Sequence, residues 1–89
     1  MEIKVEAASQ EKINELGVKS WPIWEKEASE FDWHYDEQEV CYLLEGEVEV
    51  TTKNGETVTF GAGDLVTFPA GLDCVWKIKK DVKKHYKLG

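Results

Sequence analysis

Apolar and polar residues alternate along most of the chain from Trp21 onward, and this two-residue period predicts β-strands. In TTKNGETVTF, Asn54–Gly55 separates two alternating runs, which is the strongest short signal for a β-hairpin. EVCYLLEGEVEV predicts two strands hinged near Gly46. FGAGDLVTFPAGLDCVWKI predicts two more, with turns at Gly61–Gly63 and Pro69–Gly71. Short strands at this spacing are typical of an antiparallel sandwich or barrel.

The first twenty residues carry the one predicted helix. The run IKV alternates as in a short edge strand, and SQEKINELG follows with a helical pattern. Ser9 is placed to cap this helix and Gly17 to end it, while Ile13 and Leu16 give it one apolar side. The sequence therefore predicts one all-β domain over residues 1–89, with a strand and a helix in 1–20 and a barrel in 21–89.

The composition excludes several classes of partner. Of the 89 residues, 42% are hydrophobic and 33% are charged, which is typical of a folded, water-soluble domain. The longest apolar runs are too short to cross a membrane. The net charge of −7 and the absence of arginine argue against a nucleic-acid partner, because phosphate contacts need a basic surface. We expect neither a membrane nor a nucleic acid as partner.

The charge is distributed unevenly along the chain. Residues 77–89 contain six lysines and one aspartate, a charge of +5, whereas residues 1–76 carry −12. We interpret the lysines of this last segment as solvated side chains that protect an edge strand from pairing with other chains.

Two motifs of fixed spacing resemble those of the cupin superfamily. HYDEQEVCYLLEG places His34, Glu39 and Gly46 as H-x4-E-x6-G, and GDLVTFPAGLDC reads G-x5-P-x-G-x2-C. The resemblance implies a small antiparallel jelly-roll barrel and covers roughly residues 22–80. WPIW, EVCYLLEGEVEV and CVWKIKKDVKKHY are similar to short single-domain cupins grouped with ureidoglycine aminohydrolase and ethanolamine-utilisation proteins.

The resemblance also implies a metal site, from which this chain departs. In cupins, two histidines and a glutamate of the first motif and a histidine ending the second usually hold a divalent metal. Here Asp32 stands in place of the first histidine and Cys74 in place of the last, so only His34 and Glu39 agree. This mixed set of ligands would suit zinc better than manganese.

The alternation within FDWHY argues against that metal site. Neighbouring side chains of a strand point to opposite faces, so Phe31, Trp33 and Tyr35 share one face. Burying these rings gains on the order of 2 kcal/mol each, whereas burying Asp32 without a partner costs several kcal/mol. We therefore predict that the rings face the barrel interior, that His34 faces solvent, and that no cofactor is held. A zinc or another divalent ion is the alternative.

Alternation and the resemblance together predict the lining of the barrel. In EVCYLL the inward face begins with Glu39, and in CVWKI it begins with Cys74. The predicted ligand pocket consists of Trp33, Tyr35, Glu39, Cys41, Cys74 and Trp76. Burial is expected to raise the pKa of Glu39 unless Tyr35 or Trp76 donates a hydrogen bond to it.

Both cysteines are expected to act as small apolar side chains. No export signal is visible in the first twenty residues, which predicts a cytoplasmic protein whose thiols stay reduced. A disulfide between Cys41 and Cys74 is the alternative. A buried thiol far from a cation stays protonated, so Cys74 is predicted to line the pocket rather than to act as a nucleophile.

Three functional hypotheses follow. The first is a small-molecule binding module, in which the aromatic rings supply stacking faces and Glu39 orients a compact ligand, such as one bearing an amine. The second is an enzyme without assignable catalytic residues, acting on a nitrogenous metabolite through Glu39 or a metal, as the resemblance to ureidoglycine aminohydrolase implies. The third is an accessory domain that forms a homodimer through its outer strands, with Trp21, Trp24 or Tyr42 at the surface.

Overall fold

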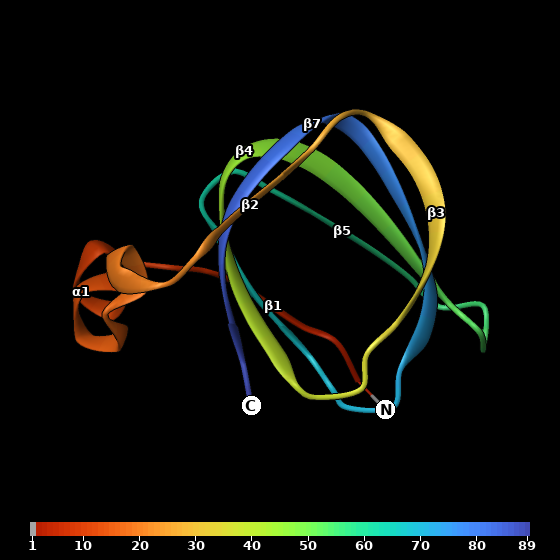
Figure 1. Ribbon diagram of the computed structural model, residues 1–89, viewed down its shortest axis with the longest axis horizontal. Coiled ribbons are helices and arrows are strands. Elements are labelled where there is room, and N and C mark those ends of the chain that lie inside the picture. Colours follow the sequence, from red (N-terminus) through yellow and green to blue (C-terminus); the bar gives the residue numbers. More distant parts are fainter. Residues whose placement is uncertain (1) are drawn as a thin grey trace.

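Two long antiparallel strands, β4 (Glu39–Thr52) and β7 (Asp73–Leu88), pair along most of their length and form the centre of the molecule. In the computed structural model, which describes residues 2–89, the shorter strands extend this pair on both sides and curl into a barrel (Figure 1). One sheet has the order β1-β6-β4-β7-β2, where the short strands are β1 (Lys4–Ala7), β6 (Asp64–Phe68) and β2 (Ile23–Lys26). Two further strands complete the barrel: β3 (Ser29–His34) pairs with β7, and β5 (Thr57–Gly61) pairs with β4. The predicted all-β jelly-roll barrel is confirmed.

A bulge at Gly46 lets β4 belong to both sides of the barrel. Its backbone has φ of +113°, and an added Cβ would lie 2.8 Å from the carbonyl oxygen of Asp81, so the close approach requires glycine. The register against β7 shifts between Leu43 and Val48. As a result, the buried side chains of β4 change from odd to even positions. The hinge predicted between two strands is thus a bulge within one continuous strand.

The hairpin and the helix lie where the sequence predicts them. Gly55, with φ of +87°, ends the turn between β4 and β5, and its N–H donates to the carbonyl of Thr52 at 2.9 Å. The helix α1 (Gln10–Leu16) is capped by Ser9 and ends at left-handed Gly17. It continues into the 3-10 turn η1 (Val18–Ser20). Ile13 is buried, whereas Leu16 is exposed, so the buried side of the helix is narrower than the sequence predicts.

The lysine-rich end of the chain is a central strand, not an edge. β7 is flanked by β4 on one side and by β2 and β3 on the other, which corrects the interpretation of residues 77–89 as an edge strand. Four of its six lysines are exposed as predicted, whereas Lys83 is partly buried and Lys84 is buried. Alternate side chains of a central strand must point inward, so Lys84 is buried, and the outward-facing His85 is also buried. Among residues 2–89, no helix is long and apolar enough to cross a membrane.

Candidate functional site

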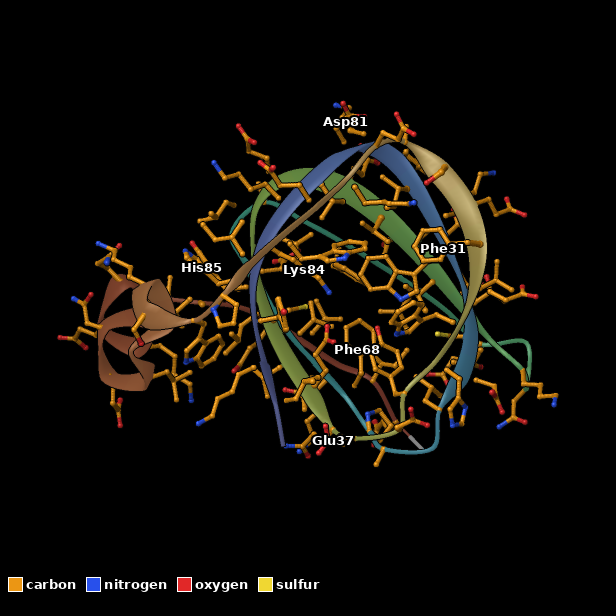
Figure 2. The ribbon with its side chains drawn as sticks, in the orientation of Figure 1. Phe31, Glu37, Phe68, Asp81, Lys84 and His85 are labelled. Atoms are coloured by element: carbon orange, nitrogen blue, oxygen red, sulfur yellow. The ribbon has the colours of Figure 1, made fainter. Side chains whose placement is uncertain are left out.

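A cavity of about 240 Å³ opens between β2, β3, β4 and β7. It is lined by aromatic rings, one aliphatic side chain and one buried ion pair: Trp24, Phe31, Trp33, Tyr35, Trp76, Tyr86, Leu88, Glu39 and Lys84. Figure 2 shows Lys84, Phe31 and Phe68 pointing into the barrel, whereas His85 lies on the side of β7 toward α1. The Nδ1 atom of His85 lies 2.9 Å from the carbonyl oxygen of Trp21.

Strand register brings these side chains together. Trp24 of β2 pairs with Lys84 of β7, and Phe31 of β3 pairs with Trp76 of β7. Directly paired residues project from the same face of a sheet, so each of these pairs faces the interior. The ring of Phe31 stacks on that of Trp76 with centroids 6.2 Å apart, and Trp24 meets Trp76 edge to face at 6.1 Å.

The polar part of the cavity is a buried ion pair. The Nζ atom of Lys84 donates to Oε2 of Glu39 at 2.7 Å, and the two side chains are only 6% and 10% exposed. The same ammonium lies 4.9 Å from the ring centre of Trp24 and 4.8 Å from that of Trp76. The carboxylate and the two ring faces together compensate the buried positive charge.

The phenol of Tyr35 is a neutral hydrogen-bonding group beside this pair. Its oxygen accepts a hydrogen bond from Nε1–H of Trp76 at 3.0 Å. Burial, followed by the nearby charge of Glu39, raises the pKa of Tyr35 well above its usual value. Tyr35 therefore keeps its proton, and a phenol whose oxygen accepts one bond can still donate another.

Of the six residues of the predicted ligand pocket, four line the cavity: Trp33, Tyr35, Glu39 and Trp76. Trp33 is 47% exposed and forms the rim, where the cavity meets a more open hollow between the end of β3, the end of β4 and the start of β7. Cys41 and Cys74 do not line the cavity. Cys41 is fully buried in the core, and Cys74 lies at the opposite end of β7, where its Sγ donates to the carbonyl of Trp33 at 3.7 Å.

Both cysteines are free thiols held in their neutral form. Burial raises the pKa of Cys41 to about 12, although the nearby ammonium of Lys84 opposes the shift. Burial also raises the pKa of Cys74 to about 11, with a smaller contribution from Asp73. Neither thiol therefore has the lowered pKa that a nucleophilic cysteine requires.

The four residues that resemble the cupin metal ligands do not converge. Asp32 and His34 lie exposed on the outer face of β3, whereas Glu39 points into the cavity. Cys74 points inward into the hydrophobic core, at the end of β7 away from Glu39, and lines a separate hollow there. Among residues 2–89, no three histidine, cysteine, aspartate or glutamate side chains are arranged to hold a metal ion. The residues present therefore do not fit the cupin metal.

His34 instead contacts two carboxylates at the surface. Its Nδ1 lies 2.7 Å from a carboxylate oxygen of Asp73, and its Nε2 lies 3.4 Å from one of Asp36. The rings at positions 31 and 35 point to the interior side of the same segment, as the alternation predicts. The aromatic face of FDWHY thus points inward and the imidazole points outward.

Five lining residues were not predicted as part of the pocket: Trp24, Phe31, Lys84, Tyr86 and Leu88. Lys84 carries a signal that the prediction did not use, because the inward alternation of Cys74 and Trp76 resumes at Val82 and Lys84 after the exposed Lys80. Trp24, which was expected at a dimer surface, faces inward because β2 pairs with the second half of β7. The pairing of β2 with β7 joins residues that are far apart in the sequence, so no local pattern around Trp24 predicts it.

The motifs, the jelly-roll barrel and the altered ligand set can now be compared with known proteins. The sequence profile of the EutQ-like cupin domain matches residues 13–86. The chain belongs to this cupin family. The predicted resemblance to ethanolamine-utilisation cupins is thereby confirmed, while the resemblance to ureidoglycine aminohydrolase stays a prediction. No curated protein matches the chain.

Solved structures agree with this assignment. The EutQ-like cupin is 58% identical to a DUF861 family protein from Thermotoga maritima, with a TM-score of 0.97 over 99% of this chain and 100% of that one. A putative ethanolamine utilization protein Q from Salmonella typhimurium is 27% identical, with a TM-score of 0.67 over 74% of this chain and 53% of that chain. The EutQ protein of Clostridium difficile shares the fold at 21% identity, with a TM-score of 0.68 over 74% of this chain and 52% of that chain. The chain thus spans about half the length of either EutQ protein.

Proposed function

We propose that this EutQ-like cupin binds a compact organic molecule in the cavity between β2, β3, β4 and β7, without the usual cupin metal site. The observation that carries the proposal is an aromatic-lined cavity of about 240 Å³ with a buried ion pair in its wall. Sites for drug-sized ligands are concave, mostly apolar and about 300–1,000 Å³ in volume, with a few placed polar groups. This cavity has the same character at a smaller size, which favours a small ligand.

The ion pair between Glu39 and Lys84 is better explained by a role in ligand binding than by a role in stability. A buried salt bridge is commonly no more stabilising than two well-packed apolar side chains, because both ions lose their hydration. Glu39 and Lys84 border a cavity into which they can direct hydrogen bonds. A polar pair in that position provides orientation for a ligand, which an apolar pair could not do.

The geometry changes one detail of the sequence-based hypothesis. Glu39 was expected to pair with an amine on the ligand, but its Oε2 is already bound by Lys84. An incoming ammonium would have to share the carboxylate with a lysine. We therefore propose a compact ligand, but not one that carries an amine.

The second candidate function is an enzyme that uses Glu39 as its acid or base. The observation in its favour is that Glu39, Lys84 and Tyr35 line the same cavity and all carry or can carry exchangeable protons. A metal-dependent reaction has less support, since the four metal-ligand positions are divided between the inside and the outside of the barrel. Any turnover would be abolished by Glu39→Gln, whereas a pure binding module shows no turnover to lose.

A titration with small aromatic compounds tests the binding proposal. The backbone amide and indole N–H signals of ¹⁵N-labelled protein are followed by NMR as benzamide, phenol or toluene is added. We expect saturable shifts at residues that line the cavity, including the indole N–H of Trp76.

A matched pair of substitutions locates the binding. Leu88→Trp introduces a large ring at the cavity lining and should remove the shifts. Ile23→Trp introduces the same ring on the exposed outer face of β2 and should leave them unchanged. If all three compounds leave the spectrum unchanged, or if Leu88→Trp has no effect on their binding, the binding proposal is wrong.

A further inference from the structure

We infer that this cavity selects neutral molecules that carry a carbonyl-type oxygen, which Lys84 and Tyr35 bind as hydrogen-bond donors. The inference rests on the proposed binding function and specifies its ligand class. Three observations lead to it: the ion pair is internally neutral, Lys84 and Tyr35 keep hydrogen-bond donors that can bind a ligand oxygen, and the rest of the wall is aromatic.

The charge of the site argues for an uncharged ligand. Glu39 and Lys84 compensate each other at 2.7 Å, and their side chains are almost completely buried. A ligand ammonium would be attracted by Glu39 and repelled by Lys84, and a ligand carboxylate would meet the opposite combination. Either ion would also lose its hydration in a mostly apolar cavity without a countercharge of its own. A neutral ligand avoids both costs.

The hydrogen-bonding groups argue for an acceptor on that ligand. The ammonium of Lys84 has three N–H groups, of which one is used by Glu39. The remaining two lie among the rings of Trp24 and Trp76, which are weaker partners than an oxygen atom. Tyr35 accepts a bond from Trp76 and retains its own proton as a donor. A carbonyl oxygen is a suitable acceptor for either group.

The aromatic wall argues for a flat or compact apolar body next to the carbonyl. Phe31, Trp33 and Tyr86 complete the lining around the ion pair. Rings of this kind stack well against planar groups, and this contact does not depend on charge. An aromatic or unsaturated amide, ketone or ester of small size therefore matches the whole site.

Three probes of nearly equal shape test the charge preference. Benzamide, benzoate and benzylamine share one ring and are neutral, anionic and cationic at neutral pH. Binding is followed by the NMR shift of the Trp76 indole N–H. We expect benzamide to bind about tenfold more tightly than either ion, which corresponds to about 1.4 kcal/mol.

Single substitutions should then change the preferred probe. Lys84→Met leaves Glu39 beside two indole rings, so we expect benzylamine to become the tightest probe. Glu39→Gln leaves an unpaired ammonium, so benzoate should become the tightest. The control variants Lys87→Met and Glu37→Gln remove one positive and one negative charge at exposed positions. In both, benzamide should remain the most tightly bound probe. Circular dichroism verifies that each variant is folded.

One further variant tests the carbonyl acceptor even if a charge variant fails to fold. Tyr35→Phe keeps the ring and removes the phenol donor, so benzamide should weaken several-fold while toluene, which has no acceptor, is unaffected. An equal loss for both compounds would contradict the role of Tyr35. Tighter binding of benzoate or benzylamine than of benzamide to the unmodified protein would overturn the inference and leave the binding function standing. Failure of every probe to bind would overturn both.

Discussion

Two lysine–glutamate pairs join the same two strands, β4 and β7, in opposite environments. Lys79 Nζ lies 3.0 Å from Glu49 Oε2 on the outside of the barrel, with side chains 40% and 31% exposed. Lys84 Nζ lies 2.7 Å from Glu39 Oε2 inside, where both side chains are buried. Water screens the outer pair, whereas the inner one cannot be separated without leaving a charge in an apolar cavity. The same chemical pair is thus a surface contact in one place and the polar centre of a candidate site in the other.

The bulge at Gly46 produces this difference. Before it, odd positions of β4 point inward and bring Glu39 to the cavity, and after it even positions do, so Glu49 is turned outward. One extra backbone residue in a strand reverses the facing of everything beyond it. The position of a carboxylate relative to the bulge therefore decides whether it belongs to the surface or to the site.

The largest expected effect comes from removing the inner cation. Lys84→Met leaves the carboxylate of Glu39 buried beside indole rings, which should lower the free energy of unfolding by about 3–5 kcal/mol. Urea denaturation followed by fluorescence measures this loss. The matched variant Lys79→Met removes the outer cation and should have little effect. Equal losses in the two variants would contradict the comparison.

Removing both inner charges should recover most of the stability that Lys84→Met loses. In Glu39→Gln with Lys84→Met, no unpaired charge is left in the cavity, and a buried ion pair is often replaceable by neutral side chains without net cost. The double variant should therefore be clearly more stable than Lys84→Met alone in the same urea experiment. If the two substitutions are simply additive, the side chains do not interact in the folded protein.

A smaller effect is expected from a neutral hydrogen bond in the same cavity. Tyr35→Phe removes the acceptor of the Trp76 indole N–H and leaves that donor buried. Such a loss costs about 1–3 kcal/mol, less than an unpaired charge. Urea denaturation should rank Tyr35→Phe between the wild type and Lys84→Met, and a greater loss than in Lys84→Met would reverse the ranking.

The two thiols provide a kinetic test of the interior. The pKa values of about 12 for Cys41 and about 11 for Cys74 mean that the reactive thiolate is scarce near pH 8 and becomes more abundant as pH rises. A disulfide reagent should therefore modify the native protein far more slowly than the urea-unfolded chain. Fast labelling of Cys41 in the native state would show that the interior is open to water.

The smallest effect concerns the outer pair and depends on pH. The hydrogen bond and charge of Lys79 lower the pKa of Glu49 below its ordinary value. The ionised carboxylate of Glu49 therefore contributes to stability above the ordinary pKa of a glutamate, and this contribution is lost as the pH falls through the lowered pKa of Glu49. Glu49→Gln should cost slightly more stability at neutral pH than in acid, and added salt should reduce the difference. A loss that is independent of both pH and salt would exclude an electrostatic origin.

Much of the fold was readable from the sequence because its signals are local. The Asn54–Gly55 turn, the cap at Ser9 and the spacing of the two cupin motifs each lie within a few residues of one another. The inward face of FDWHY also follows from alternation, since burial of rings outweighs burial of an unpaired aspartate. These elements required no knowledge of which strands pair.

The site was readable only in part because its central contact is long-range. Glu39 was found through a motif, but Lys84 lies in a lysine-rich segment whose charge suggests a solvated strand. Alternation along β7 indicates that Lys84 points inward. The ion pair with Glu39 offsets the free-energy cost of burying its charge, and this pairing is not visible in the sequence. Alternation in CVWKI predicts that Cys74 points inward, and it does, but it lies at the end of β7 away from the ion pair and does not line the cavity.

The most direct test of the account is an NMR measurement of the lysine ammonium groups. The ammonium of Lys84 donates a hydrogen bond to Glu39, is almost completely buried and lies close to the rings of Trp24 and Trp76, so its protons should exchange slowly. At neutral pH and low temperature they should give one slowly exchanging signal displaced by the ring currents, which disappears in Lys84→Met and persists in Lys79→Met. Rapid exchange of every lysine ammonium in the folded protein would contradict a buried pair between Lys84 and Glu39.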